Sequence, residues 1–507
     1  MKIKAAKKVI VILSALSMLF TVSCSPGRNA GQDTASSGSS SIKDTFQSGS
    51  SKDAPDNGQE KESQTTKNDK KESGQTQSFA EAHDAFKTTL AREENDDDPI
   101  ADPPEGYFDL IKYPSTVGDL AAYVSSDPGD GEKHPLIIWV VGGWGNGIDD
   151  FPWCYPAWDN DQTGSAFWQA DILMMYPSFR GGNGNPGHYE ALFGEVDDIA
   201  AAYDYAASLP YVDPDRIYLG GHSTGATRAL LAAEYTDKFR AVFCFGAVDE
   251  VKYHNNSQFT FDTSIEEEFT MRSPIHWLDD IKTPTFLIEG SDGNADNLKN
   301  IENATDNENI HCYVIPGQDH FSVLAPLTRV AAEKILSDTG AEPDITITQE
   351  ELESAMKQDP VTPLPLMMTF TDEDLGLSMS YPFLWEVQDV SEEGEIAWYL
   401  TSMYEEDNVW DLATLYIDAY EPELGVQEIV DSLKEEGLEA TPLTINGMDA
   451  VQYVDMFEDE EGYSYQNTYV IVFTKDAMVS FDFYIPEYYG EDAKELFQTM
   501  IDSIRTE

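Results

Sequence analysis

Apolar runs and helical patterns alternate along the middle of the chain. Six short apolar runs are bounded by turn residues, at positions 135–141, 172–176, 217–219, 240–245, 284–288 and 311–315. Runs without polar alternation are typical of strands covered on both faces. Amphipathic or alanine-rich stretches between and after them predict helices at 196–208, 226–235 and 327–336. This alternation predicts an α/β domain with a doubly wound, mostly parallel sheet, whose site lies at the carboxyl ends of the strands.

The last third of the chain has a different pattern. Apolar and polar residues alternate in several segments between 367 and 483, and helical patterns cover 426–436 and 491–504. Alternation with a period of two is typical of antiparallel strands with one solvated face. A smaller α+β domain is therefore expected over residues 366–507. The acidic, proline-containing residues 344–365 are expected to form a linker.

The N-terminus carries an export signal. Residues 1–8 are basic, residues 9–22 are apolar, and Ser23 and Cys24 follow. The apolar run is short for a membrane span, so residues 1–23 are predicted to be a signal peptide. Small residues before a cysteine resemble the bacterial lipoprotein cleavage box, although Thr21 replaces its usual leucine. The resemblance implies a lipid anchor on Cys24 and an extracytoplasmic location at the bacterial cell membrane; the alternative is an ordinary secretory signal.

Residues 24–98 are predicted to be a disordered tether. They are rich in Ser, Gly, Gln, Lys and Asp and contain few large apolar residues, so they cannot bury enough surface to offset their chain entropy. Residues 99–343 then form the α/β domain.

Charge and cysteine content exclude several classes of function. The chain has 31 basic and 93 acidic residues; 13 and 15 of these lie in residues 1–98, which leaves 18 and 78 for the rest. A surface this acidic argues against nucleic-acid partners and against direct binding to anionic lipid. Cys244 and Cys312 lie in apolar runs and are expected to be buried thiols. No cluster of His and Cys has the spacing of a metal site, so neither metal nor cofactor is expected.

Residues 216–235 contain the clearest catalytic pattern. The apolar run 217–219 leads into Gly221-His222-Ser223-Thr224-Gly225, and an alanine- and leucine-rich helix follows. A G-x-S-x-G between a strand and a helix is the nucleophile elbow, in which the serine occupies a strained turn. Ser223 is the predicted nucleophile.

Six ordered blocks extend this pattern, at residues 176–181, 195–202, 209–217, 221–225, 273–285 and 317–321. Residues 134–338 thereby resemble an α/β-hydrolase, most closely the catalytic domains of the prolyl oligopeptidase and dienelactone hydrolase groups. The C-terminal domain resembles, more loosely, the PsbP/Mog1-like domains of bacterial lipoproteins, which implies a binding or scaffold role toward an unknown protein partner.

The hydrolase resemblance implies a catalytic triad. His320 matches the family base. The family places its acid three residues after a glycine, and that position holds Gly293, so the acid is open. Asp292 is the first choice, Asp296 the second and Asp249 the third.

The resemblance also implies an oxyanion hole. Thr224 is expected to supply one N–H, and the loop after Val141 the other, from Trp144 or Gly143. Arg180 either pairs with local acids or binds a substrate carboxylate. The nearby tryptophans (Trp144, Trp153, Trp158 and Trp168) form either an aromatic pocket wall or a packed cluster.

Together these features predict a membrane-tethered serine hydrolase that cleaves a small ester or peptide substrate through an acyl-enzyme on Ser223. The alternative is a hydrolase scaffold that has lost its acid and acts as a binding or surface interaction protein.

Overall fold

The computed structural model describes residues 77–153, 160–253, 256–358, 366–383, 385–391, 397–402, 414–420, 424–458, 464–475, 477–486 and 490–506. The predicted signal peptide, the lipid attachment site Cys24 and the tether up to residue 76 lie outside these residues. Within the described part of the chain, no helix combines the length and the apolar character needed to cross a membrane.

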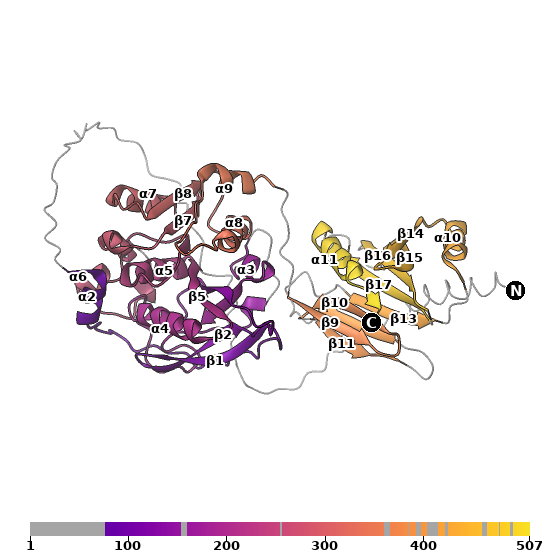
Figure 1. Cartoon of the computed structure of the whole chain (residues 1–507), viewed down its shortest axis with the longest axis horizontal. Helices are drawn as coiled ribbons and strands as arrows, with labels where there is room; N and C mark the ends of the chain where they lie inside the picture. Colours follow the sequence, from indigo (N-terminus) through magenta and orange to yellow (C-terminus); the bar gives the residue numbers. More distant parts are fainter. Residues whose placement is uncertain are drawn as a thin grey trace, which may run out of the picture. The chain divides into compact units, whose positions relative to one another are not determined.

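A mixed eight-stranded sheet forms the centre of the first region (Figure 1). Its strands are β1 (Phe108–Ser115), β2 (Gly118–Ser125), β3 (His134–Val140), β4 (Leu173–Pro177), β5 (Val212–His222), β6 (Val242–Phe245), β7 (Thr285–Gly290) and β8 (Ile310–Ile315). Their order is β1-β2-β4-β3-β5-β6-β7-β8. The predicted parallel part is confirmed from β4 to β8, whereas β1 and β2 add an antiparallel edge that the sequence analysis did not predict.

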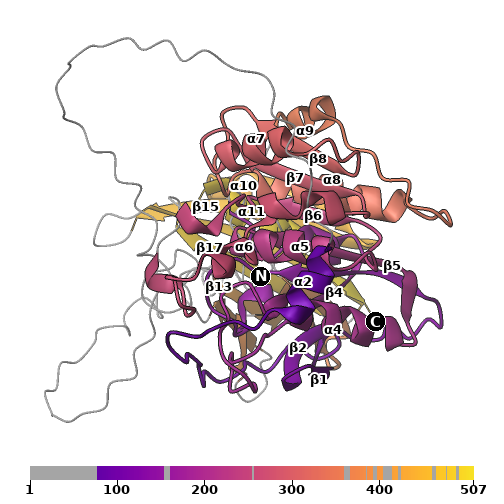
Figure 2. The same cartoon turned by 90° about the vertical axis from the view of Figure 1, so that its left-hand side faces the viewer.

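Helices cover both faces of this sheet, as a doubly wound fold requires. One face packs against α4 (Glu195–Ser208), α5 (Thr224–Tyr235) and α7 (Ala295–Ala304). The other face packs against α3 (Ser165–Gln169), α8 (Leu324–Ser337) and α9 (Gln349–Ala355). Figure 2 looks onto the α4–α5 side, with α2 (Phe79–Ala85) and α6 (Glu266–Thr270) in front. Short 3-10 helices lie in the connections, at Phe151–Trp153, Val251–Tyr253, Asn256–Gln258, Pro274–His276 and Leu278–Asp280.

Both predicted boundaries of this domain need correction. Residues 77–98, predicted to belong to a disordered tether, begin with α2, whose Phe79 and His83 are buried. Residues 86–98, here called the N-terminal strap, follow α2 across the domain, and Leu90 bridges to Phe261. At the other end, Ile345, Ile347 and Leu352 of the predicted linker, the last of them in α9, are buried in the same core cluster as α8. The folded domain therefore extends beyond residues 99–343 in both directions, while the linker residues 359–365 lie outside the described part.

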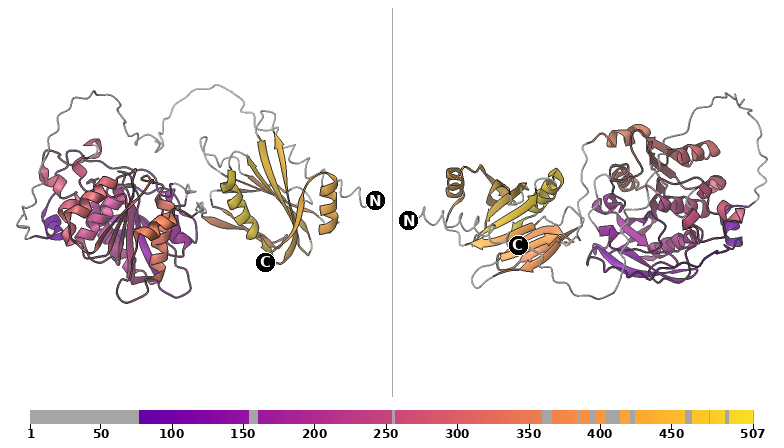
Figure 3. Two further views of the ribbon diagram at one scale, coloured as in Figure 1. Left: turned by 90° about the horizontal axis from the view of Figure 1, so that it is seen from above. Right: turned by 180° about the vertical axis from the view of Figure 1, so that it is seen from behind.

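The C-terminal region is antiparallel throughout, as predicted. Its strands are β9 (Met367–Asp372), β10 (Leu377–Pro382), β11 (Trp385–Asp389), β12 (Ala397–Ser402), β13 (Thr414–Tyr420), β14 (Ala440–Ile445), β15 (Met448–Glu458), β16 (Ser464–Phe473), β17 (Met478–Pro486) and β18 (Arg505–Thr506). They form a three-stranded sheet, β18-β10-β9, and a seven-stranded sheet, β11-β12-β13-β17-β16-β15-β14. Figure 3 shows α10 (Val426–Glu435) and α11 (Gly490–Asp502) on opposite sides of the larger sheet.

Candidate active site

Ser223 occupies the turn between β5 and α5 in a strained conformation. Its backbone angles are φ 58° and ψ −120°, a region that non-glycine residues rarely adopt. The glycines on either side make the turn possible. An added Cβ would lie 2.7 Å from the carbonyl oxygen of Val140 at Gly221, and 2.1 Å from the same oxygen at Gly225. The predicted strand–turn–helix context of the elbow is therefore confirmed.

The backbone of the elbow is tied to the neighbouring strand β6. The Ser223 N–H donates to the carbonyl oxygen of Phe245 at 2.7 Å. Gly246 follows Phe245 with φ 76°, and an added Cβ there would lie 2.3 Å from Cε1 of His320. The imidazole of His320 thus lies against the end of β6, the strand whose last carbonyl group accepts the Ser223 N–H.

A buried carboxylate orients His320. Its Nδ1 is 2.8 Å from Oε2 of Glu289, whose side chain is fully buried at the end of β7. The other carboxylate oxygen, Oε1, accepts from the N–H of Gly290 at 2.8 Å. A carboxylate at Nδ1 favours the tautomer that carries its proton there. This tautomer leaves Nε2 with a lone pair that can accept a proton.

Glu289 replaces the acids that the sequence analysis proposed. Asp292 is exposed, and its side chain accepts from the hydroxyl of Ser291. The side chain of Asp296 is 93% exposed and pairs with Lys299. Asp249 is buried, but its carboxylate accepts from the side chain of Asn300 at 2.7 Å. The assignment of Asp292 as the partner of His320 is therefore wrong, and neither alternative takes its place.

Gly293 explains why the carboxylate comes from another position. An added Cβ at Gly293 would lie 2.3 Å from Oε1 of Glu289 and 3.0 Å from the backbone nitrogen of His320. The Glu289 carboxylate thus fills the space beside the histidine loop that a side chain at 293 would enter. One signal in the sequence could have identified it, because Glu289 is the charged residue that ends the apolar run 284–288, and a buried charge requires a partner.

His222 packs beside the candidate base. Its Nε2 is 3.0 Å from the backbone oxygen of His320, and the two ring centroids are 4.5 Å apart. Burial, and then the positive charge that His320 can carry, lower the pKa of His222 to about 3. His222 is therefore neutral near pH 7, and its Nε2–H can donate to the histidine loop.

The glycine-rich loop 142–147, here called the oxyanion loop after its predicted role, passes beside Ser223. An added Cβ at Gly142 would lie 3.3 Å from Cβ of Ser223, and the hydroxyl of Thr224 donates to the carbonyl oxygen of Gly143. The indole of Trp144 packs edge-on against Phe259 at 5.7 Å. Thr224 and Gly143, two of the residues predicted to supply oxyanion donors, are thus in contact beside Ser223, and Trp144 follows Gly143 in the same loop.

Arg180 and Trp153 have structural surroundings. Arg180 is 4% exposed, and its guanidinium donates to both oxygens of Asp198 at 2.9 Å and to Glu190 at 3.0 Å. Burial lowers the pKa of Arg180, but the hydrogen bonds and charge of Asp198 outweigh it and raise the pKa overall. The interpretation as a partner of local acids is confirmed. Trp153 is buried against Phe108 and Tyr123, as a packed cluster requires, whereas Trp158 lies outside the described residues.

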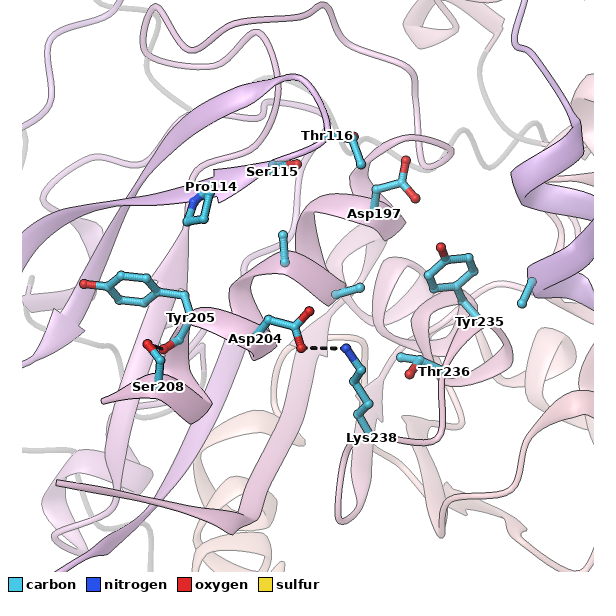
Figure 4. Close-up of a pocket in the computed structure, with 13 residues that line it drawn as sticks. Pro114, Ser115, Thr116, Asp197, Asp204, Tyr205, Ser208, Tyr235, Thr236 and Lys238 are labelled. Carbon is cyan, nitrogen blue, oxygen red and sulfur yellow. Dashed lines mark hydrogen bonds and ion pairs between the residues drawn. The ribbon is translucent and has the colours of Figure 1, made fainter. Parts of the chain in front are cut away.

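Among the described residues, no group of His, Cys, Asp and Glu has a geometry that could hold a metal ion. A surface groove of about 840 Å³ runs along α4, with Asp204 and Lys238 paired across it at 2.5 Å (Figure 4). Ser223, His320 and Glu289 do not line this groove. The candidate site is thus distinct from it.

Comparison with known proteins agrees with this geometry. Residues 160–323 match the family model described as the prolyl oligopeptidase family, and this span includes Ser223, His320 and Glu289. No curated protein matches the chain.

Three solved structures represent the similar folds. A Mycobacterium tuberculosis puromycin-hydrolyzing peptidase is 20% identical, with 46% of this chain and 39% of that chain covered and a TM-score of 0.38. The Pyrococcus horikoshii acylaminoacyl peptidase is 15% identical, with 48% and 43% covered and a TM-score of 0.38. An esterase from the archaeon Pyrobaculum calidifontis is 14% identical, with 46% and 86% covered and a TM-score of 0.35. The chain spans less than half the length of the two peptidases, and such low scores support no assignment of substrate.

Residues 160–323, which match the prolyl oligopeptidase family model, thus contain the elbow serine and the His320–Glu289 pair, the groups that a serine hydrolase uses.

Proposed function

We propose that the protein hydrolyses an ester or small-peptide amide bond through an acyl-enzyme on Ser223. His320 removes the proton from the Ser223 hydroxyl as this oxygen attacks the carbonyl carbon. The protonated imidazole then donates to the leaving group, and water releases the acyl group by the same route in reverse order. Glu289 keeps His320 in the required tautomer and stabilises its positive charge.

The hydrogen bond between His320 and Glu289 is the observation that carries this proposal. A serine hydroxyl is a weak nucleophile without a base, and a base requires an orienting group. The alternative, a hydrolase scaffold without its acid, was motivated by the glycine at position 293. The fully buried carboxylate of Glu289, 2.8 Å from Nδ1 of His320, supplies an acid from another position and so favours the enzyme over this alternative.

The oxyanion of the tetrahedral intermediate requires donors fixed in place before the reaction. We assign the N–H of Thr224, at the N-terminus of α5, as one donor. The backbone N–H of Trp144 or Gly143 is the second. The contact between the Thr224 hydroxyl and Gly143 supports this assignment because it joins the two segments that carry these donors.

An activity panel tests the proposal. Purified protein is expected to release p-nitrophenol from short-chain esters, with a burst of about one p-nitrophenol per molecule, or to release aminocoumarin from aminoacyl amides. Ser223→Ala is expected to abolish the burst. Equal activity of wild type and Ser223→Ala would contradict the proposal, as would inactivity of wild type across the panel.

We further propose that the domain is tethered outside the cytoplasm by a lipid on Cys24. The basic and apolar N-terminal residues and the Ser23-Cys24 pair support this proposal. Expressed in a bacterium, the full chain is expected in the membrane fraction, and Cys24→Ser in the soluble extracytoplasmic fraction. The same distribution for both would contradict the tether.

A further inference from the structure

The oxyanion loop has little internal rigidity of its own. Four of its six residues are glycines, at positions 142, 143, 145 and 147. Glycine backbones have the widest conformational freedom, so such a loop holds a donor in place only if other groups anchor it. Asn146 is one of the two residues with larger side chains, and it is 1% exposed.

The Asn146 side chain connects the loop to three other segments. Its Nδ2 donates to Oε1 of Glu195 at 2.8 Å and to the carbonyl oxygen of Arg180 at 2.9 Å. Its Oδ1 accepts from the Arg228 guanidinium at 3.0 Å. Both amide hydrogens and the amide oxygen are therefore satisfied within the protein.

The backbone of Asn146 is anchored as well. Its carbonyl oxygen accepts from the Phe179 N–H at 2.8 Å and from the Ser178 hydroxyl at 3.1 Å. An added Cβ at Gly182 would lie 2.3 Å from the carbonyl carbon of Asn146. The loop backbone thus has little room to move at this residue.

Arg228 relates these bonds to the nucleophile. It lies in α5, five residues after Ser223, and is 1% exposed. Its guanidinium reaches Asn146 and, at 3.5 Å, the carbonyl oxygen of Gly145. The same helix carries the Thr224 N–H at its first residue. Helix α5 therefore positions both proposed oxyanion donors, one directly and the other through Arg228.

An amide suits position 146 better than a carboxylate. The side chain must donate to the carboxylate of Glu195 and accept from the guanidinium of Arg228. Glu195 is fully buried, and burial raises its pKa, but the charges of Arg228 and Arg180 together with its hydrogen bonds outweigh this and lower the pKa overall. An aspartate at 146 would lack both donors and place a second negative charge against Glu195.

From these contacts we propose that Asn146 is a positioning residue, which holds the oxyanion loop in register with helix α5 through Glu195 and Arg228. This inference rests on the proposed serine hydrolase function. The role is specific to the transition state, because the loop donor bonds the oxyanion more strongly than the ground-state carbonyl.

Asn146→Ala tests the role, with Asn307→Ala as its matched control. Asn307 also makes three side-chain hydrogen bonds, to Leu278, Ile281 and Asn309, but it precedes β8 at the end of the sheet opposite the candidate site. Both variants are expected to lower the melting temperature. Asn146→Ala alone is expected to lower the burst rate and kcat with the ester substrate by about 10²-fold, with KM changed less than about threefold.

Arg228→Lys gives a second test if Asn146→Ala does not fold. The lysine keeps a positive charge facing Glu195 but loses the guanidinium that reaches Asn146 and Gly145. We expect kcat to fall about tenfold with KM nearly unchanged. An active wild type whose Asn146→Ala and Arg228→Lys variants match Asn307→Ala in kcat would overturn this inference alone. An inactive wild type would overturn the proposed function together with it.

Discussion

At the residue scale, Glu289 is where the structure changes the sequence-based account most. Ser223 could be predicted from the strand–turn–helix pattern around it, and His320 from the resemblance of its loop to the family's histidine loop. The acid could not, because it depends on how far a side chain reaches across a folded loop. Counting positions from Gly290 led to Asp292, whereas the carboxylate beside His320 belongs to Glu289, four residues before Gly293.

The two candidate acids, Glu289 and Asp292, lead to opposite expectations for single substitutions. Glu289→Gln removes the charge and can present an N–H to His320, which favours the wrong tautomer. We expect kcat to fall about 10²–10⁴-fold. Asp292→Asn, which alters an exposed side chain, is expected to stay within about twofold of wild type in the same assay. A large loss in Asp292→Asn with little loss in Glu289→Gln would restore the original assignment.

An exchange of the acid gives a stricter test. The Glu289→Ala variant empties the space next to Gly293, and Gly293→Asp places a new carboxylate there. We expect the double variant to recover at least about tenfold of the kcat lost in Glu289→Ala. Gly293→Asp alone should be impaired, because its side chain collides with Glu289. The assay is ester hydrolysis. If a folded double variant recovered no activity, a carboxylate at position 293 could not replace that of Glu289 beside His320.

His222 predicts a pH dependence of stability. Its folded pKa of about 3 lies below the ordinary value of 6.5, so the unfolded chain binds a proton that the folded chain does not. Stability from this group is therefore fully present above pH 6.5 and is lost as the pH falls below it. Between pH 7.5 and pH 5 the loss is about 2 kcal/mol. Urea unfolding should show a smaller decrease for His222→Gln over this range, and an identical decrease would contradict the assignment.

At the element scale, patterns within a segment were reliable and boundaries were not. Buried strands of the parallel sheet could be read from continuous apolar runs because both of their faces are covered. The edge strand β1 could not, because only Phe108 and Tyr113 of its eight residues are buried, so it has no continuous apolar run. The strap 86–98 has few apolar residues, and it is held by polar contacts between distant segments, which composition does not reveal.

Asp96 illustrates how the strap is held. Its backbone N–H donates to Gly181 at 2.9 Å, and its carboxylate accepts from the Asn183 N–H at 2.7 Å and from the Tyr189 hydroxyl. Asp96→Ala leaves these donors without a partner and is expected to cost about 1–3 kcal/mol of unfolding free energy. Asp97→Ala, at the exposed neighbouring position, serves as the control in the same denaturant titration. Equal stability of the two variants would contradict a structural role for the strap.

At the scale of the whole molecule, the net charge of −62 is the dominant property. Repulsion among like charges destabilises a compact chain, and salt screens it over a Debye length of about 10 Å at 0.1 M. The melting temperature is therefore expected to rise by several degrees between about 0.01 M and 0.5 M sodium chloride. Calorimetry at constant pH measures this, and a lower melting temperature in salt would count against the argument.

The central claim is that Ser223 is an activated nucleophile, and covalent labelling tests it most directly. A fluorophosphonate reacts with serines that have a functioning base and oxyanion hole, and mass spectrometry locates the adduct. We expect one label per molecule of wild type, on the peptide that contains Ser223, much slower labelling of Glu289→Gln, and none of Ser223→Ala. An unlabelled wild type, or a label that persists in Ser223→Ala, would contradict the account.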